Sequence, residues 1–250
     1  MLETILLATI LVSATSLLLV SVLLLHKNLI KKISFLLVSF AAGSLLATGF
    51  MDTLKEAVEL KGTDVFLWTT IAIAVFFIIE RLFLSLHHHA EEDNFGGKDN
   101  LKLPTPFLLF GDSLHNFIDG MSIAAGFLVN FQVGLITSFA VFIHEIPHEL
   151  GDFGILISKG WGRFSVLWVN AATGIACIFG AITAYYLGQQ FEGIVPLLLS
   201  ITTANFIYLS TADLLPEIHH KSQKGLAIKN TISFLLGILL VAILTTFVGE

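Results

Sequence analysis

Long apolar stretches separated by short polar connections dominate the amino-acid sequence. Eight of these stretches are long enough to cross the hydrocarbon core of a bilayer, which takes about 20 residues of α-helix. They lie near residues 3–26, 33–55, 64–86, 106–129, 133–158, 163–188, 194–216 and 230–249. The pattern predicts an all-α, polytopic membrane protein with eight transmembrane helices that form a single domain over residues 1–250.

The low charge content supports this assignment. Charged residues make up 13% of the chain and hydrophobic residues 55%, whereas soluble domains are about 25% charged. Such a small number of charges cannot cover a surface that faces water, so we expect most of the exterior to contact the lipid bilayer. The formal net charge of −6, without a basic stripe, argues against a nucleic-acid partner.

The basic residues are distributed unevenly between the connections. If the N-terminus is outside, only Lys55 and Lys61 of the 13 Lys and Arg residues fall in outside connections. The inside connections then carry Lys27, Lys31, Lys32, Arg81, Lys98, Lys102, Lys159, Arg163, Lys221, Lys224 and Lys229. Because cytoplasmic loops carry an excess of basic residues, we expect a multi-pass protein of the plasma membrane with both termini outside.

The second and seventh stretches share a pattern at a constant offset of 161 residues. Residues 36–39 (LLVS) match residues 197–200 (LLLS), and residues 52–56 (DTLKE) match residues 213–217 (DLLPE). The two helices would run in opposite directions, so the match predicts an inverted repeat that relates the first and last three helices. Such repeats are common in secondary transporters.

The fourth and fifth stretches differ from the others because each carries a cluster of histidine and acidic residues. The fourth contains DSLHNFIDG from Asp112, and the fifth contains HEIPHELGD from His144. His115 and Asp119 are four residues apart, as are His144 and His148, so each pair lies on one helix face. The short connection makes the two helices antiparallel neighbours, which brings the clusters together.

Acidic side chains at this depth need compensation. An acid at the centre of a membrane helix costs roughly 2.5 to 3.5 kcal/mol, and Asp119, Glu145 and Glu149 all lie within apolar stretches. A divalent cation would neutralise them. Imidazole with carboxylate and amide oxygens suits Zn²⁺, Cd²⁺, Fe²⁺, Mn²⁺ or Co²⁺, whereas Cu⁺ prefers thiolate and thioether ligands. The structural alternative is a hydrogen-bonded cluster that only ties the two helices together.

Pro147 lies in the middle of the fifth stretch. Proline lacks an amide donor and displaces the carbonyl four residues earlier, here that of Ile143. A broken helix at membrane depth is tolerated where it lines a polar cavity. We therefore expect a helix break and a cavity beside His144.

Further acidic residues are candidates for a metal pathway to and from this site. Asp52 and Asp213 occupy equivalent positions of the repeat near the two membrane faces, where solvated helix ends are the alternative interpretation. The complete set of pathway candidates is Asp112, Glu149, Asp152, Asp52 and Asp213.

Residues 87–103 are predicted to form a cytosolic loop between the third and fourth helices. The loop begins with His87, His88 and His89, followed by acids. A flexible histidine cluster binds metal weakly, and a solvated polar linker is the equal alternative. Asn170 and Asn205 also lie within apolar stretches, but nothing in the sequence determines which way they face.

In the two motifs the chain resembles the Zrt/Irt-like (ZIP) family of divalent metal transporters. The most specific parts are HNFIDG from His115 and HEIPHE from His144, and the latter has the form of the branch with a His-Glu-x-Pro-His-Glu motif. The resemblance covers essentially the whole chain, including the histidine-bearing loop and the DLLPE segment that ends the seventh stretch at Glu217.

This resemblance implies transport of divalent transition-metal cations, Zn²⁺ first, toward the cytosol by a homodimer. It implies elevator-like alternating access and a binuclear site that holds up to two ions midway through the membrane. The implied ligands are His115, Asp119, His144 and His148 for one ion, and Asn116, Asp119, Glu145 and His148 for the other. Some family members add an acid from the sixth helix, and the sixth stretch here contains none.

Other functions fit parts of the pattern. The segment from His144 to His148 matches H-E-x-x-H, the zinc and general-base motif of metalloproteases. Pro147 and the excess of ligands on the fourth helix oppose an intramembrane protease, so we do not expect an enzyme. A sensor or scaffold with a structural zinc would need closed four-fold ligation. An exporter of the same ions is the third alternative, because the sequence does not determine direction.

Overall fold

The computed structural model describes the chain apart from residues 93–104, 192, 222–225 and 248–250. The described residues form helices joined by short turns and contain no β-strand, which confirms the all-α class. In chain order the elements are α1 (Leu2–Leu23), α2 (Lys27–Thr48), η1 (Gly49–Thr53), α3 (Leu54–Lys61), α4 (Asp64–Glu92), α5 (Thr105–Val129), α6 (Phe131–Ser158), α7 (Arg163–Gln190), α8 (Ile194–Tyr208), η2 (Leu209–Leu214), α9 (Leu215–Lys221) and α10 (Ala227–Phe247).

Within the described part of the chain, six helical segments are long and apolar enough to cross a membrane. They are α1, α2 with η1 and α3, α4, α7, α8 with η2 and α9, and α10. The helices α5 and α6 have 25 and 28 residues and are therefore long enough, but their histidine and acidic residues make them more polar. Eight crossings, with α5 and α6 included, remain a prediction.

Large apolar side chains are exposed on the outside of the protein, and several acidic and histidine side chains are buried inside it. On the outside, Leu18, Phe164 and Trp168 are 65%, 72% and 63% exposed. On the inside, Asp119 and His144 are each 1% exposed. Because extended apolar surface is unfavourable in water, this exterior suits a bilayer, and the polar residues are enclosed between the helices.

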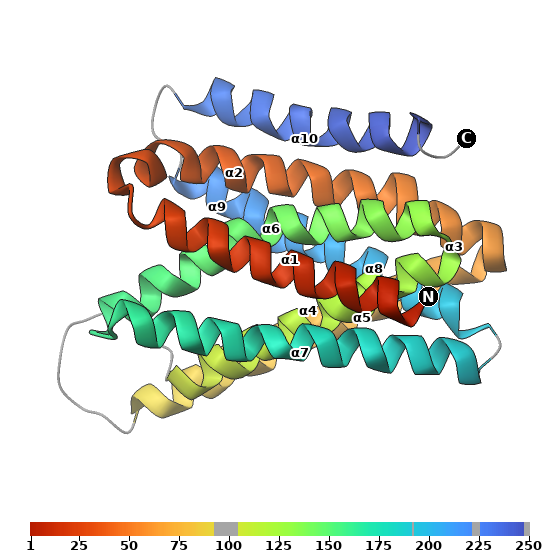
Figure 1. Ribbon diagram of the computed structural model, residues 1–250, viewed down its shortest axis with the longest axis horizontal. Coiled ribbons are helices and arrows are strands. Elements are labelled where there is room, and N and C mark those ends of the chain that lie inside the picture. The colour runs from red at the N-terminus through yellow and green to blue at the C-terminus, as the bar shows by residue number, and fades with distance from the viewer. Residues whose placement is uncertain (93–104, 192, 222–225, 248–250) are drawn as a thin grey trace.

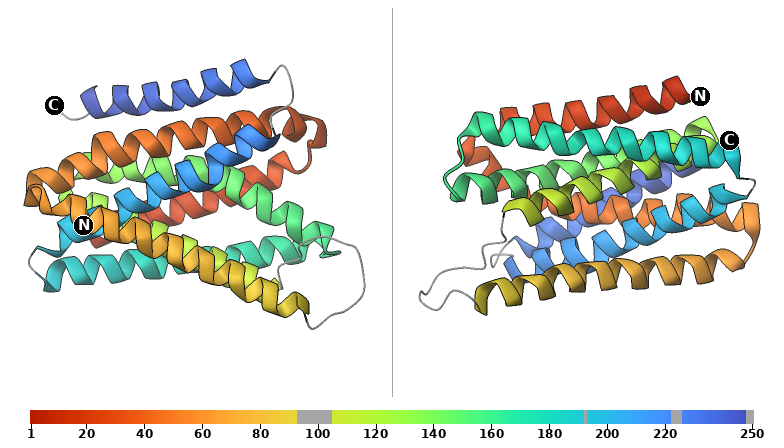
Figure 2. Two further views of the ribbon diagram at one scale, coloured as in Figure 1. Left: turned by 180° about the vertical axis from the view of Figure 1, so that it is seen from behind. Right: turned by 90° about the horizontal axis from the view of Figure 1, so that it is seen from below.

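The helices form two groups that pack side by side, as the right-hand view of Figure 2 shows. The first group contains α1, α5, α6 and α7, in which α5 packs along α7 and α1 contacts both α6 and α7. The second contains α2, α4, α8 and α10 with the short elements, in which α10 packs along α2 and α4 along α8. Across the boundary α6 meets α2, and α5 meets α8.

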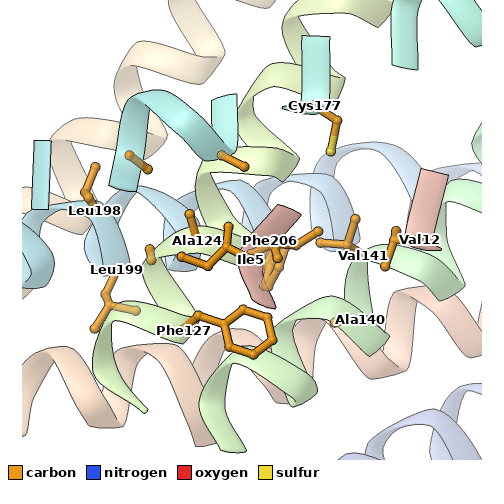
Figure 3. Packing of buried hydrophobic residues seen from close by; sticks show 14 of the residues in the cluster. Ile5, Val12, Ala124, Phe127, Ala140, Val141, Cys177, Leu198, Leu199 and Phe206 are labelled. Atoms are coloured by element: carbon orange, nitrogen blue, oxygen red, sulfur yellow. The ribbon is translucent and has the colours of Figure 1, made fainter. Parts of the chain in front are cut away.

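A buried apolar cluster joins the first group to α8 (Figure 3). It includes Ile5 and Val12 of α1, Phe127 of α5, Val141 of α6, Cys177 of α7 and Phe206 of α8. The Phe206 side chain is fully buried, and the free thiol of Cys177 is buried as well. This apolar packing positions α8 against the helices that carry the histidine motifs.

Pairs of glycines allow the closest helix contacts. A Cβ atom built on Gly120 of α5 would lie 1.8 Å from the carbonyl oxygen of Cys177, and one on Gly180 of α7 would lie 1.9 Å from that of Phe117. Neither distance is sterically possible, so only glycine permits the observed approach of α5 to α7. Small residues at such positions are a common means of packing membrane helices.

Two π-helical segments interrupt the long helices of the second group. They are η1, which contains Asp52, and η2, which contains Asp213. These two residues are 161 positions apart, so the π-helical segments lie at corresponding positions of the predicted repeat. Thr53 shares a 2.8 Å hydrogen bond with Thr203 of α8, and the Ser210 hydroxyl donates to the carbonyl oxygen of Ala42 at 2.8 Å. The sequence pattern did not predict the π-helical geometry.

The predicted break at Pro147 is wrong. The helix α6 is one continuous helix from Phe131 to Ser158 with Pro147 inside it, although it changes direction part-way along its length (Figure 1). Proline removes one hydrogen bond and bends a helix, and the flanking turns remain helical.

The predicted loop of residues 87–103 also begins later than expected. The helix α4 extends to Glu92, so His87, His88 and His89 lie in its last turns. Polar residues can continue a helix beyond the apolar stretch, because their backbone hydrogen bonds are unaffected. The side chains of these histidines and residues 93–104 lie outside what the structure describes, so their predicted metal binding stays a prediction.

The glycine contact between α5 and α7 can be tested by substitution. We expect Gly120→Ala to destabilise the protein by about 1–3 kcal/mol or more, because overpacking forces the two backbones apart. Thermal unfolding in detergent, followed by size-exclusion chromatography, measures the effect. Gly111→Ala on the same helix is the control, since a Cβ atom there meets nothing within 4 Å. Equal melting temperatures for the two variants would contradict the close-contact interpretation.

Candidate metal centre

The centre lies between α5 and α6, at the boundary of the two helix groups. On α5, His115 and Asp119 are separated by one turn and face α6, whereas on α6 His144 and Glu145 face α5. These four residues form one cluster in which the nitrogen and oxygen ligand atoms all lie within 4.8 Å of one another. We call it the four-ligand cluster.

The spacing within the four-ligand cluster matches the coordination shell of zinc. A tetrahedron with bonds of 2.0–2.1 Å has edges of roughly 3.3–3.4 Å. From His115 Nε2 the distances are 3.2 Å to His144 Nε2, 3.4 Å to Asp119 Oδ2 and 3.3 Å to Glu145 Oε1. From His144 Nε2 they are 2.9 Å to Asp119 Oδ2 and 3.9 Å to Glu145 Oε1. The measured edges therefore bracket the required length.

The contacts of His144 are compatible with a metal ligand. Its Nδ1 lies 3.0 Å from the carbonyl oxygen of Ala140, which can only accept, so Nδ1 carries the hydrogen. In neutral His144 the Nε2 lone pair then points at Asp119 Oδ2, 2.9 Å away, which is itself an acceptor. Two facing acceptors repel each other unless a proton or a metal ion lies between them. The backbone bond thus prepares Nε2 as a ligand.

A second cluster, the three-ligand cluster, lies next to the first. Asp112, His148 and Asp152 place their ligand atoms within 4.8 Å of one another, with His148 Nδ1 3.8 Å from Asp112 Oδ1 and 3.4 Å from Asp152 Oδ2. Within the described residues, His148 Nδ1 and Asp152 Oδ2 are buried and make no hydrogen bond. The rings of His115 and His148 are stacked with centroids 4.3 Å apart, so the two clusters are adjacent.

The geometry groups His148 differently from the ligand sets that the resemblance implied. Those sets placed His148 with His144 and with Glu145, whereas its Nδ1 faces Asp112 and Asp152 in the structure. The Asn116 amide nitrogen donates to Asp112 Oδ1 at 2.9 Å and to the Asp112 carbonyl oxygen at 3.1 Å, so Asn116 contacts the three-ligand cluster through Asp112. The ligand sets that the resemblance implies stay a prediction.

Asn116 borders a cavity of about 220 Å³ that is lined by residues of α1, α5, α6 and α7. Asp112, Glu149 and Asn170 also line it. The Ser16 hydroxyl of α1 donates to Glu149 Oε1 at 2.9 Å, which accounts for one of the two carboxylate oxygens. Glu149 is therefore held on the side of α6 that faces α1 and not in either ligand cluster.

A second cavity, of about 350 Å³, lies beside the clusters. His115, His144 and His148 line it, and Asp152 of α6 borders it as well. Asp213 of η2 and Glu217 of α9 line it from the other helix group. The structure thus brings Asp213 to the same cavity as the histidines, whereas Asp52 is a buried residue of η1 that lies in neither cluster and lines neither cavity.

Two residues of α8 complete the surroundings of the four-ligand cluster. The Asn205 amide donates to Asp119 Oδ1 at 3.4 Å, and the Phe206 ring lies 6.4 Å from the His144 ring, centroid to centroid. The sequence signalled Asn205 only as a polar residue within an apolar stretch. Whether the Asn205 side chain points toward α5 depends on how α8 is rotated about its axis, and the sequence of this apolar stretch does not determine that rotation.

A family model described as "ZIP Zinc transporter" matches residues 99–245, a range that contains both ligand clusters and more than half of the chain. The chain belongs to the ZIP family. The two motifs on α5 and α6 lie inside the matched range, so the resemblance noted in the sequence is confirmed.

Individual relatives within the family support the same assignment. The chain is 37% identical over 145 residues to Zinc transporter foi of Drosophila melanogaster, which is 57% of this chain and 20% of that protein. It is 37% identical over 113 residues to human Zinc transporter ZIP6, covering 45% and 15%. Zinc transporter ZIP13 of Pongo abelii is 27% identical over 229 residues, covering 85% and 67%. The chain therefore spans about a fifth or less of the length of the first two relatives.

The four-ligand cluster predicts tight zinc binding that depends on His144. We expect His144→Ala to weaken Zn²⁺ binding at least about 100-fold, because loss of a ligand exceeds the 10–100-fold effect of losing a supporting partner. Isothermal titration of the purified protein in detergent measures the affinity. The control is His219→Ala, since His219 of α9 is exposed. Unchanged zinc affinity in His144→Ala, with His219→Ala also normal, would exclude His144 as a ligand.

Proposed function

We propose that the protein transports divalent transition-metal cations, Zn²⁺ first, across the membrane through the centre between α5 and α6. The observation that carries this proposal is the four-ligand cluster between α5 and α6, in which Asp119, His144 and Glu145 are buried and the ligand atoms lie close to the spacing of a zinc tetrahedron. The names of the relatives, all zinc transporters, support the same substrate.

The ligand chemistry supports zinc but extends to neighbouring ions. Two imidazoles and two carboxylates form a borderline ligand set, which also suits Cd²⁺, Fe²⁺ and Mn²⁺. The cluster contains no thiolate, since Cys177 is buried in the apolar cluster of Figure 3. Selectivity among these ions therefore depends on geometry and not on ligand softness.

We further propose that the site is binuclear. The four-ligand cluster would hold one ion, and Asp112, His148 and Asp152 would hold a second one with an open coordination position. A three-ligand site leaves room for water, as in catalytic zinc sites, and so exchanges its ion more readily. The rings of His115 and His148 are stacked, so the two proposed ions would lie side by side.

The direction of release follows from the cavity. The cavity is lined by Asp152 and Ile155 near the C-terminal end of α6, and by Glu217 near the C-terminal end of α9. The basic residue Lys159 follows α6 directly. Both termini lie at the opposite end (Figure 1). The positive-inside rule makes the end with most basic residues cytosolic, so the cavity would open to the cytosol. We propose import, in which this conformation releases the ion.

The two helix groups suggest how access alternates. The ligands of both clusters belong to α5 and α6 of the first group, whereas Asp213, Glu217 and Asn205 border them from the second. A sliding of the first group against the second would move the ion relative to the membrane, as the elevator mechanism of the resemblance implies. The predicted inverted repeat, homodimer and plasma-membrane location belong to the same proposal.

The alternatives have less support. A protease would use His144 and His148 on one zinc, but their ligand atoms face different clusters, and the relatives named above are transporters and not enzymes. A structural zinc is favoured by the closed four-ligand cluster, yet His115 and His144 line a cavity that leads outward. Ion flux distinguishes these functions.

Flux into proteoliposomes tests the proposed function directly. We expect saturable Zn²⁺ uptake by the purified full-length protein, and no uptake above empty vesicles for His144→Ala, because the ion loses a ligand in the only route that the proposal provides. His219→Ala is the matched control and should transport normally. Zinc binding without flux in the unaltered protein would indicate the structural-site alternative, and cleavage of a membrane substrate would indicate the protease.

The binuclear arrangement predicts a change in stoichiometry. We expect two Zn²⁺ ions per chain in the unaltered protein and one in Asp152→Ala, because Asp152 contributes only to the three-ligand cluster. Equilibrium dialysis with metal analysis measures the ratio. Glu59→Ala is a control, since this acid is exposed and pairs with Lys55 on α3. Two ions in Asp152→Ala would remove the three-ligand cluster from the proposal.

A further inference from the structure

We propose that Asn205 of α8 is a positioning residue for Asp119, and that the zinc affinity of the four-ligand cluster therefore depends on how α8 packs against α5. This inference rests on the proposed zinc site and adds a residue from the opposite helix group. Neither motif contains Asn205, and the ligand sets implied for the site do not include it.

The two carboxylate oxygens of Asp119 have different partners. Oδ2 faces the imidazoles, 2.9 Å from His144 Nε2 and 3.4 Å from His115 Nε2. Oδ1 accepts a hydrogen bond from the Asn205 amide at 3.4 Å. An ion in the cluster would therefore bind Oδ2, and the Asn205 contact could persist on Oδ1. The amide fixes the rotation of the carboxylate about its terminal bond, which is otherwise broad.

The hydrogen bond between Asn205 and Asp119 joins the two helix groups. Asp119 belongs to α5 and Asn205 to α8, and both side chains are buried, at 1% and 6% exposure. The next residue of α8, Phe206, lies against His144. Consecutive residues of one helix thus contact two of the four ligands, so a shift of α8 along α5 changes both supports together.

This arrangement links affinity to conformation. Partners that hydrogen-bond to metal ligands typically change metal affinity 10–100-fold when they are removed. If the first group slides away from α8, Asp119 loses the Asn205 amide, and the centre binds its ion more weakly. By linkage, a bound ion then favours the packing in which Asn205 and Asp119 are in contact. Asn205 would thus couple loading of the site to the arrangement of the two groups.

The test replaces Asn205 by a residue of similar size without polar atoms. We expect Asn205→Leu to lower the affinity for Zn²⁺, added as the metal alone, 10–100-fold in isothermal titration of the full chain in detergent. In proteoliposomes the KM for Zn²⁺ should rise by a similar factor while the maximal rate stays within about twofold. A purely structural role would instead lower the amount of active protein, and thus the maximal rate, at constant KM.

A matched variant on the same helix controls for disturbance of the packing. Thr202 is 2% exposed and its hydroxyl donates to the Leu198 carbonyl oxygen of its own helix, so Thr202→Val should leave zinc affinity and KM unchanged. Unaltered zinc affinity in Asn205→Leu, or equal losses in both variants, would overturn the inference. Absence of flux in the unaltered protein would contradict transport and not this inference, because the affinity measurement needs no flux.

Discussion

The constraint on which the rest of the structure depends is the burial of Asp119 and Glu145 beside two imidazoles. Buried carboxylates need a cation, a proton or hydrogen bonds to compensate them, and here their oxygens converge with two imidazole nitrogens. This convergence requires that α5 and α6 present matching faces and that α5 keeps a fixed position against α7. The close contact of Gly120 with α7 supplies that fixed position.

The ligands become fewer from the interior toward the open cavity. The four-ligand cluster offers four ligands, the adjoining three-ligand cluster offers three, and Asp213 and Glu217 line the same cavity from the other helix group. In the proposed transport, an ion that moved along this series would exchange protein ligands for water in small steps. No single step would then remove the whole coordination shell, which would keep each barrier low.

The sequence was most informative where local periodicity decides the structure. The four-residue spacing of His115 and Asp119, and the polarity of two otherwise apolar stretches, sufficed to predict the all-α class and a meeting of histidine and acidic residues between α5 and α6, but not how these residues group into two clusters. Prediction failed where the outcome depends on tertiary fit. The facing of Asn205 and the pairing of His148 with Asp152 both depend on how one helix rotates against another, and hydropathy does not record that rotation.

The π-helical segments η1 and η2 have a consequence for the adaptability of the protein. Each accommodates an additional residue within a helical turn, and one residue corresponds to a rotation of about 100°. The side chains of α3 and α9 are therefore rotated relative to the faces that an uninterrupted α-helix would give them after α2 and α8. An insertion at such a turn changes which side chains face the neighbouring helices while the chain stays helical, so the ends of these two spans can change their facing without repacking of the residues before the bulge.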